Sequence, residues 1–406
     1  MKPNEMELRL LNEIINLRDK LQNARIKSHE VSLLRQAVEA NLQQITNLPM
    51  LTVVHNLKAH TNRVHDIVWV PNDRYVLTVG SEGCIVIWDP KIGLIHNVYD
   101  ASKIQPITVA ATNDAQSLFC GGLCATVVLA NKVEQPPEDG YSYYDSKSVY
   151  EHSGQINCIL CMNDNQLLTC SVGDGALIWD IERVKVIGRY SHSTSQVTTA
   201  CFLHDDSSTF LTADEEGVIH HWDIRKSDNS VSCFEGHQAD VNCIKSLPNG
   251  YNFVTGSEDT FIHLYDIRTD IIIAKYRDKQ ARPITSSGDN EVTVVASGLQ
   301  PTTPTTPAYA ASPMTQATSI MNYSDNIQRQ DVPAVNDLAV SNSGRLVISG
   351  CNDWNIYYWD LSRSDKCVRY DTEIGPVMKL AMSNKRNALA MMTWDPKVKI
   401  NIMRPR

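Results

Sequence analysis

The octapeptide GCIVIWDP, residues 83–90, is a run of apolar and β-branched residues that ends at a Trp-Asp pair and a proline. This composition is typical of a short β-strand that is closed by a turn. The same ending returns four times further along the chain, as DGALIWDI, GVIHHWDI, TFIHLYDI and WNIYYWDL. A segment that recurs at a fixed spacing is the sequence signature of a repeat architecture, so the distances between these endings indicate the fold.

The spacing of the endings predicts repeat units of four strands each. Trp179, Trp222 and Tyr265 follow one another at intervals of 43 residues, which matches the period of about 40 to 45 residues in WD40 propeller blades. Trp88 lies 91 residues before Trp179, or about two periods, so a degenerate unit is expected between them. The segment FCGGLCATVVLANK contains this unit, with an Ala-Asn pair in place of Trp-Asp.

The C-terminal part of the chain completes the count of blades. Trp359 lies 94 residues after Tyr265, and the surplus falls in an insert at about 279–333 whose prolines and short polar residues predict disorder. A last run, ALAMMTWDPKVKIN, ends 42 residues after Trp359. We therefore predict an all-β, seven-bladed WD40 propeller over residues 49–406. LTVVHNL, just before His60, is predicted to be the outer strand of the last blade and to close the ring.

Residues 1–48 are predicted to form a coiled-coil helix. From residue 5 to residue 47 there is no glycine or proline, and apolar residues recur at steps of four and three. The seam consists of Leu10, Ile14, Leu17, Leu21 and Ala24, and it weakens after about three heptads. A seam this narrow favours a second helix as its partner, although packing on its own domain is the other interpretation.

Composition excludes several classes of protein. The net charge of -9 argues against a nucleic-acid-binding surface. No apolar run approaches the roughly 20 residues that span a bilayer. The eleven cysteines show no disulfide framework, and the chain does not open on a signal peptide, so we expect reduced thiols in the cytoplasm. The single CxxC, Cys158 and Cys161, lacks a second ligand pair and is interpreted as two structural strand residues rather than a metal site.

Histidine and threonine residues precede most of the Trp-Asp endings. The sets are His60 with Thr78, His152 with Thr169, His192 with Thr212, and His237 with Thr255 and Asp259. They resemble catalytic triads, but an enzyme needs one activated nucleophile, whereas every blade needs a buried hydrogen-bond network between its strands. No P-loop, HExxH helix or nucleophile elbow occurs either. We therefore predict no enzymatic activity, no cofactor and no metal site.

The acidic residue of the tight turn varies between the repeats. Asp259 and Asp353 occupy the expected place, Glu82 and Glu216 replace it in two other units, and Asp174 lies one position away. We predict that the units with a changed acid are looser. The last blade departs further, with Glu373, Met391 and Asn401 in place of the histidine, the threonine or serine, and the tryptophan. We expect a less cooperative last blade that depends on the N-terminal strand.

A coiled-coil helix followed by seven such blades resembles the β subunit of a heterotrimeric G protein. The segments NLRDKLQNARIKSH, LKAHTNRVHDIVW, LFCGGL, GHQADVNCIKSLPNGYNFVTGSEDTFIHLYDIR and SGRLVISGCNDWNIYYWD follow the pattern of that family in order. The proline- and threonine-rich insert is most similar to the fungal pheromone-pathway form. The resemblance implies a helix that pairs with a γ subunit and a propeller face that holds the GDP-bound α subunit. It also implies an effector kinase or scaffold of a mitogen-activated kinase pathway, and a cytoplasmic protein held at the inner face of the plasma membrane by lipidated partners.

By position, the resemblance implies an α-subunit-binding surface of ten residues: Arg63, His65, Gln105, Ile107, Leu123, Gln155, Gln196, Asp240, Glu258 and Trp394. His65, Gln105 and Gln155 stand where the family commonly carries aromatic residues, and Gln196 stands where an aspartate is usual. Because interface energy concentrates in aromatic and arginine anchors, Trp394, Arg63 and Leu123 are expected to contribute more.

Two further expectations remain open at the level of sequence. Thr303, Thr306 and Ser312 each precede a proline in the insert, so they are candidates for proline-directed phosphorylation, and the other interpretation is a passive loop. The chain as a whole is also compatible with a WD40 scaffold or adaptor unrelated to G proteins, because the propeller fold hosts many functions.

Overall fold

The computed structural model describes Lys20 and residues 50–112, 115–132, 144–163, 165–191, 196–203, 208–226, 230–269, 271–278, 333–362, 367–372, 375–385, 387–395 and 398–404. Three sets of predicted residues lie outside these ranges. They are the coiled-coil positions Leu10, Ile14, Leu17, Leu21 and Ala24, the insert positions Thr303, Thr306 and Ser312, and the single residues His192 and Glu373.

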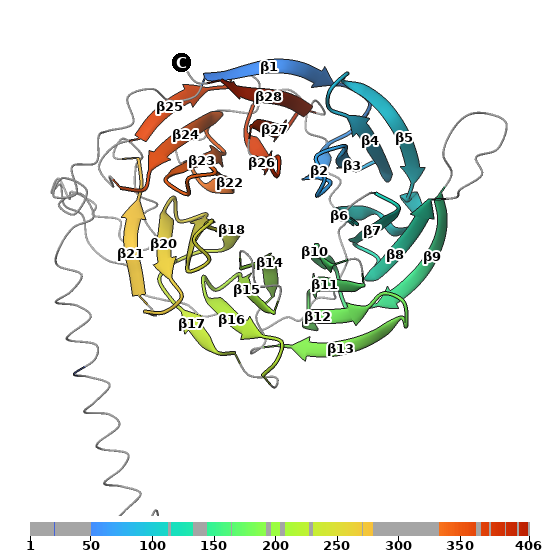
Figure 1. The fold of residues 1–406 in the computed structure, drawn as a ribbon, viewed down its shortest axis with the longest axis horizontal. Coiled ribbons are helices and arrows are strands. Elements are labelled where there is room, and N and C mark those ends of the chain that lie inside the picture. The colour runs from blue at the N-terminus through green and yellow to red at the C-terminus, as the bar shows by residue number, and fades with distance from the viewer. Residues whose placement is uncertain are drawn as a thin grey trace, which may run out of the picture.

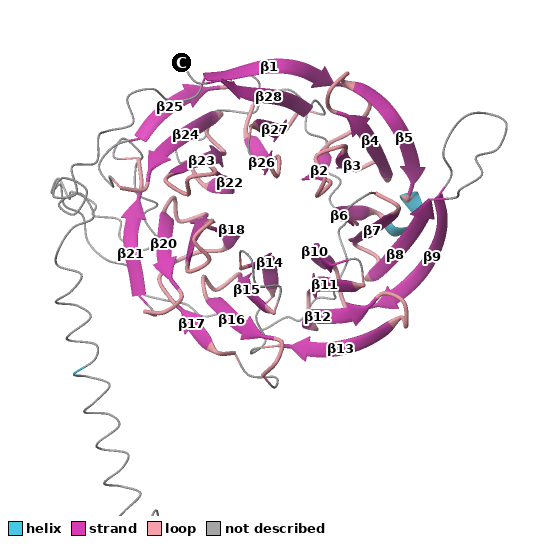
Figure 2. Cartoon of the chain, viewed as in Figure 1, coloured by secondary structure: helices cyan, strands magenta, loops and turns pink. Residues whose placement is uncertain are grey.

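The described strands form seven antiparallel sheets of four strands, arranged as a ring (Figures 1 and 2). The first three sheets, each given from inner to outer strand, are β2 (Val64–Trp69), β3 (Val76–Gly80), β4 (Cys84–Asp89) and β5 (Leu94–Asp100); β6 (Pro106–Ala111), β7 (Ser117–Gly122), β8 (Thr126–Lys132) and β9 (Tyr144–Glu151); and β10 (Ile156–Asn163), β11 (Gln166–Ser171), β12 (Gly175–Asp180) and β13 (Lys185–Tyr190). A short 3-10 helix, η1 (Ser102–Ile104), connects the first two.

The other four sheets complete the ring. They are β14 (Val197–Phe202), β15 (Thr209–Asp214), β16 (Ile219–Asp223) and β17 (Ser232–Phe234); β18 (Val241–Ser246), β19 (Asn252–Ser257), β20 (Ile262–Asp266) and β21 (Ile271–Tyr276); β22 (Val335–Val340), β23 (Leu346–Cys351), β24 (Asn355–Asp360) and β25 (Cys367–Asp371); and β26 (Val377–Met382), β27 (Ala388–Thr393), β28 (Val398–Arg404) and β1 (Met50–Leu57). The predicted seven-bladed propeller is confirmed, and the degenerate unit is its second blade.

The ring closes by pairing the first described strand with the last. β1 lies antiparallel to β28, from Met50 opposite Arg404 to Leu57 opposite Val398. This confirms the prediction that LTVVHNL is the outer strand of the last blade. The closure is reinforced where blade seven meets blade one, because the Trp69 indole donates to the carbonyl of Ala381 at 2.9 Å.

The hydrophobic core lies mostly between neighbouring blades. The cluster at the closing seam combines Leu57, Val398 and Ile400 of blade seven with Val64 and Trp88 of blade one. Middle strands such as β3 are buried along their whole length, as expected for strands that are covered on both faces. Each blade therefore completes its core only when both neighbours are present, which is why the units cannot be stable singly.

In four of the blades, the repeated Trp-Asp ending is a clasp between neighbouring strands. The Trp88 indole donates to the hydroxyl of Thr78 on the adjacent strand at 2.8 Å, and the Asp89 carboxylate accepts from the Lys91 amide at 2.9 Å, which shapes the turn into β5. The tryptophan bond recurs as Trp179 to Thr169, Trp222 to Thr212 and Trp359 to Ser349. Sequence repetition thus reflects one hydrogen-bond pattern that is reused around the ring.

The last blade lacks this clasp, as its sequence indicated. Met391 and Asn401 are buried in the places of the threonine and the tryptophan, and the Nδ2 group of Asn401 has no hydrogen-bond partner among the described residues. An unsatisfied buried amide costs free energy. Blade seven therefore depends on the pairing of β1 and β28 more than the other blades depend on their outer strands.

Two further observations bear on the general class of the protein. All eleven cysteines lie in the described ranges, and none forms a disulfide. No helix within the described ranges is long and apolar enough to cross a membrane.

Deletion of residues 49–58 is expected to abolish cooperative unfolding, because it removes the outer strand of a blade that lacks the tryptophan clasp and closes the ring. Urea denaturation monitored by far-UV circular dichroism and by tryptophan fluorescence would measure this. Deletion of residues 1–48, which leaves β1 in place, is the control for chain shortening. A variant without residues 49–58 that unfolds in one steep transition would contradict the closure mechanism.

Candidate protein-binding face

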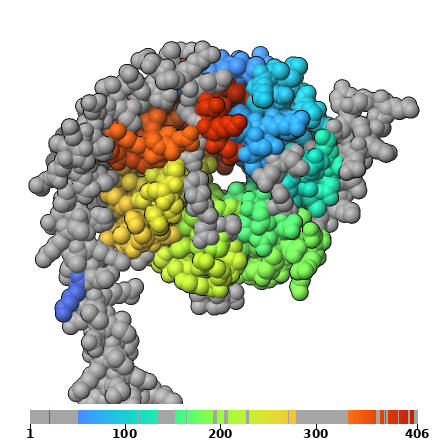
Figure 3. Space-filling view, viewed as in Figure 1, coloured from blue at the N-terminus to red at the C-terminus, as the bar shows by residue number. Residues whose placement is uncertain are grey.

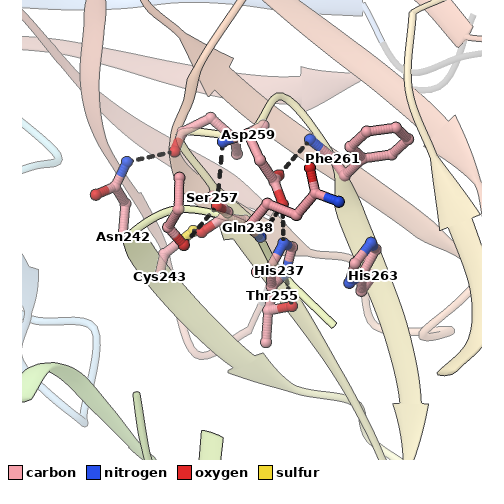
Figure 4. A network of polar contacts seen from close by, with 12 residues as sticks. His237, Gln238, Asn242, Cys243, Thr255, Ser257, Asp259, Phe261 and His263 are labelled. Atoms are coloured by element: carbon pink, nitrogen blue, oxygen red, sulfur yellow. Dashed lines mark hydrogen bonds and ion pairs between the residues drawn. The ribbon is translucent and has the colours of Figure 1, made fainter. Parts of the chain in front are cut away.

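The histidine networks that resemble catalytic triads are buried between strands. In blade five, the ring of His237 lies between Thr255 Oγ1, 2.7 Å from its Nε2, and Asp259 Oδ2, 2.8 Å from its Nδ1 (Figure 4). His60 contacts Thr78 and Glu82 in the same way in blade one. These contacts confirm the predicted networks in both blades.

The threonine hydroxyls in these networks are not available as nucleophiles. Thr78, Thr169 and Thr255 have no exposed surface. In blades one and three the hydroxyl accepts from the clasp tryptophan and lies 3.5 Å from a strand carbonyl. A catalytic hydroxyl must reach a substrate, and these do not. The geometry therefore fits a structural role.

Two of the changed turn acids lie close to the histidine of their blade. Glu82 reaches His60, and Asp174, one position away from the usual place, lies 3.3 Å from His152. This contact is longer than the 2.8 Å between His237 and Asp259, and the Nδ1 atom of His152 has no hydrogen-bond partner among the described residues. In blade four, Asp214 Oδ2 lies 3.7 Å from His220 Nε2. The looser packing of these blades stays a prediction.

One series of backbone hydrogen bonds defines a single face of the ring. In every blade, an amide in the turn between the second and third strands donates to the carbonyl of the residue that precedes the innermost strand by one position. The seven pairs are Ser81 to Arg63, Leu123 to Gln105, Val172 to Gln155, Glu215 to Gln196, Glu258 to Asp240, Asn352 to Ala334 and Trp394 to Pro376, with N to O distances of 2.8 to 3.3 Å. We call the surface made by these turns and entries the entry face.

The ten residues predicted to bind a partner all belong to the entry face. Eight are members of the seven hydrogen-bonded pairs, and the other two, His65 and Ile107, lie two positions further along β2 and β6. The fold thus brings together residues from blades one to five and seven that lie up to 331 positions apart in the sequence. Leu123 is the most exposed apolar member, with 54% of its surface accessible.

Hydrogen bonds between neighbouring blades fix the spacing of this face. In four consecutive blades, the second residue of the innermost strand donates through its side chain to the carbonyl that opens the next innermost strand. These bonds are Asn157 to Val197, Thr198 to Val241, Asn242 to Val335 and Asn336 to Val377, at 2.6 to 2.9 Å. Because the blades are locked at the edge that carries the site, the entry face is a rigid platform.

A cation–π pair joins blade one to blade seven on this face. The Arg63 guanidinium carbon lies 3.9 Å from the centroid of the Trp394 ring, a geometry that contributes about 0.5 to 2 kcal/mol. His65 is nearby, with its Nε2 atom 3.0 Å from Ser81 Oγ. Burial, followed by the charge of Arg63, lowers the pKa of His65, so this side chain is neutral at physiological pH. We call Arg63 and Trp394 the seam pair.

The charge on the other side of the face is negative. Asp240 and Glu258 lie in a hydrogen-bonded pair in blade five, and Glu215 and Glu216 are exposed in the equivalent turn of blade four. Partial burial and the neighbouring Asp240 charge raise the pKa of Glu258. These four residues form an acidic region, whereas the seam pair supplies a cation and an aromatic ring.

The structure adds residues that sequence reasoning missed. Trp354 lies in the blade-six turn of the entry face, which no predicted residue represents. On the outer rim, Ile92, Leu94 and Ile95 are 47 to 62% exposed. His55 of β1 contacts this rim segment through the Lys91 carbonyl. Two signals in the sequence could have indicated these residues. One is a tryptophan at a turn position where blades one, three and four carry glycine, and the other is the group of apolar residues in and before an outer strand.

A central channel of about 840 Å³ runs between the innermost strands, and the space-filling view shows a narrow opening in the ring (Figure 3). Asp66 and Asp337 project into it, and each accepts backbone amides of the next blade. Lys245 pairs with Asp337 at 3.2 Å. Among the described residues, no cluster of three or more acidic, histidine or cysteine side chains is arranged to hold a metal ion.

Comparison with known proteins agrees with this architecture. A family described as "WD domain, G-beta repeat" matches residues 51–89, 184–223, 228–266 and 327–360. The chain is 24% identical to a guanine nucleotide-binding protein subunit beta of Oryza sativa subsp. japonica, over 86% of this chain and 83% of the relative. It is 22% identical to the corresponding subunit of Zea mays, over 95% and 92%, and 25% identical to that of Saccharomyces cerevisiae, over 85% and 78%.

Acidification is expected to destabilise the propeller through the buried histidine pair of blade five. The rings of His237 and His263 stack with centroids 3.9 Å apart, and burial lowers the pKa of His263 from 6.5 to about 3. Between pH 6.5 and about pH 3, the unfolded chain therefore binds a proton at His263 that the folded chain does not bind. The contribution of His263 to the free energy of unfolding is fully present above pH 6.5. It is lost as the pH falls towards 3, by up to about 1.4 kcal/mol per pH unit.

Urea denaturation at a series of pH values would measure this loss. The variant His263→Phe keeps an aromatic ring against His237 but cannot titrate, so its stability should fall less steeply below pH 6. Equal slopes for the two proteins would show that His263 does not exclude the proton.

Proposed function

We propose that this chain is a G protein β subunit that binds a GDP-loaded α subunit on the entry face and a γ subunit through residues 1–48. It signals to effectors after α is released, and it catalyses no reaction. The observation that carries the proposal is the convergence of all ten candidate residues on one rigid face. The similarity to several guanine nucleotide-binding protein β subunits along most of the chain supports the same conclusion.

The entry face suits a partner that contacts both its acidic region and its seam pair. The acidic region of Asp240, Glu258, Glu215 and Glu216 attracts basic side chains, and such complementarity gives orientation and speed of association. The seam pair offers a partly exposed aromatic ring with a cation on it. A partner whose surface changes with its nucleotide would be bound in one state and released in the other by these contacts.

The binding energy on this face is expected to concentrate at the seam pair. His65, Gln105 and Gln155 are polar, and Gln155 is engaged with Asn157 at 3.0 Å rather than presented as an anchor. Aromatic and arginine side chains dominate most protein interfaces. Trp394 and Arg63, together with the exposed Leu123, are therefore the anchors that we assign to α binding.

Finer parts of the proposal rest on sequence. Leu10, Ile14, Leu17, Leu21 and Ala24 supply the seam for γ, and the lipid anchor of the partners would hold the complex at the inner face of the plasma membrane. The insert suggests a pheromone-pathway role, with a kinase or its scaffold as effector. Thr303, Thr306 and Ser312 are the proposed phosphorylation sites in this insert.

Purification of the tagged full-length chain from its own cells, followed by mass spectrometry, tests the function as a whole. We expect a small γ-like chain in stoichiometric amount. We also expect an α subunit that dissociates when a non-hydrolysable analogue of GTP is added to the complex. A stable monomer or homodimer with neither partner would favour a WD40 scaffold or adaptor of another kind.

The substitution Trp394→Ala is expected to weaken α binding at least tenfold, or about 1.4 kcal/mol, while γ remains bound. Titration of the complex with γ against GDP-bound α, by isothermal calorimetry, measures this. Tyr251→Ala is the matched control, since Tyr251 is also an aromatic ring beneath an arginine, Arg268 at 4.5 Å, but lies in the turn between β18 and β19, away from the entry face. Unchanged α affinity in Trp394→Ala would remove the seam pair from the interface.

A further inference from the structure

Trp354 occupies a backbone conformation that disfavours large side chains. It is the last residue of the turn before β24, with φ of 70°. The equivalent residues of five other blades are also left-handed, namely Gly83, Ala125, Gly175, Gly217 and Thr260, with φ from 57° to 91°. A Cβ atom is strained in this region, and a bulky residue there is a genuine outlier. Three of the other blades avoid the strain with glycine.

The turn itself does not require an indole. Its fixed point is the backbone carbonyl of Trp354, which accepts from the amide and the hydroxyl of Thr372 at 3.0 and 2.8 Å. The carbonyls of Gly83 and Ala125 accept amides in the same way, from Ala101 and His152 at 2.8 Å. Since glycine and alanine hold this geometry equally well, the tryptophan adds nothing to the backbone contacts. Residues that are held in sparsely populated backbone conformations cluster at functional sites.

Trp354 and Trp394 lie in corresponding turns of neighbouring blades. Trp354 is in the turn between β23 and β24 of blade six, and Trp394 is in the turn between β27 and β28 of blade seven. The Thr372 hydroxyl is also within 3.2 Å of the Gly375 carbonyl, and the nearest heavy atom to a Cβ built on Gly375 is the Cβ of Trp394, at 3.9 Å. With Arg63 stacked on Trp394, the three side chains form a border across blades six, seven and one. We call it the aromatic border.

The aromatic border has a different character from the rest of the face. Trp354 and Trp394 are both partly exposed. The acidic region of Glu215, Glu216, Asp240 and Glu258 lies in blades four and five, and blade five packs against blade six. Apolar side chains of a partner fit the border, and basic side chains of the same partner fit the acidic region.

We infer that Trp354 is a further contact residue for the partner of the entry face, and that it recognises an apolar or aromatic side chain next to the one that meets Trp394. This inference rests on the proposed function and extends it to blade six, where no candidate residue was expected. It also explains how the face retains aromatic contact area although positions 65, 105 and 155 are polar. The strain at Trp354 is then offset by binding rather than by folding.

The test is the substitution Trp354→Gly in the full chain complexed with γ. Because glycine relaxes the left-handed turn, the thermal midpoint is expected to stay the same or rise by a few degrees. The affinity for GDP-bound α is expected to fall about tenfold. Trp354→Asn, which also tolerates this conformation, should behave alike and guards against an effect of chain flexibility. Thr260→Gly, at the same turn position of blade five, should leave the affinity unchanged.

Three results would overturn the inference. Unchanged α affinity in both Trp354 variants would show that the indole does not touch the partner. The proposed function would remain if Trp394→Ala weakens α binding in the same assay while both Trp354 variants bind α normally. A lowered thermal midpoint with unchanged affinity would show that the indole stabilises blade six. A wild-type complex with γ that binds no α in either nucleotide state would remove the proposed function, and the inference with it.

Discussion

The antiparallel pairing of β1 with β28 is the interaction on which the rest of this structure depends. A row of packed sheets has two open ends, and each end would expose a core face and an unpaired strand edge. Here the same blade receives its outer strand from one end of the described propeller and its other three strands from the other end. Every inter-blade contact, including the bonds that space the entry face, presupposes that this seam is closed.

Closure also explains why the candidate binding residues lie in or next to turns. The strands of each blade are occupied by hydrogen-bond networks and by contacts with the next blade, so their histidines, threonines and tryptophans are buried and committed. The side chains of the turns take no part in these strand networks, and they differ in charge and size from blade to blade. The entry face therefore combines a rigid framework with side chains that differ from blade to blade, which suits specific binding.

The two residues that we propose as binding anchors, Arg63 and Trp394, also join blades at the seam. Trp394 and Arg63 lie on opposite sides of the closure, so their cation–π contact both supports the ring and presents an aromatic surface. Blade seven also lacks the tryptophan clasp, because Met391 and Asn401 replace the threonine and the tryptophan. A partner bound across the seam would therefore stabilise this junction of the propeller, since ligands that bind only the folded state add to its stability.

The sequence by itself determined the number of blades and the closing strand. These follow from a strict repeat period and from the alternation of apolar residues, which are local patterns that survive without coordinates. It did not reveal that Glu82 and Asp174 keep their histidine contacts, that Arg63 stacks on Trp394, or that Trp354 is held in a left-handed turn. The contacts of Glu82 and Asp174 lie within single blades, and the conformation of Trp354 belongs to one turn, so these features depend on how neighbouring strands of a blade fold together. The stacking of Arg63 on Trp394 was decided by the closed ring, because closure brings together two side chains that lie more than 300 residues apart in the chain.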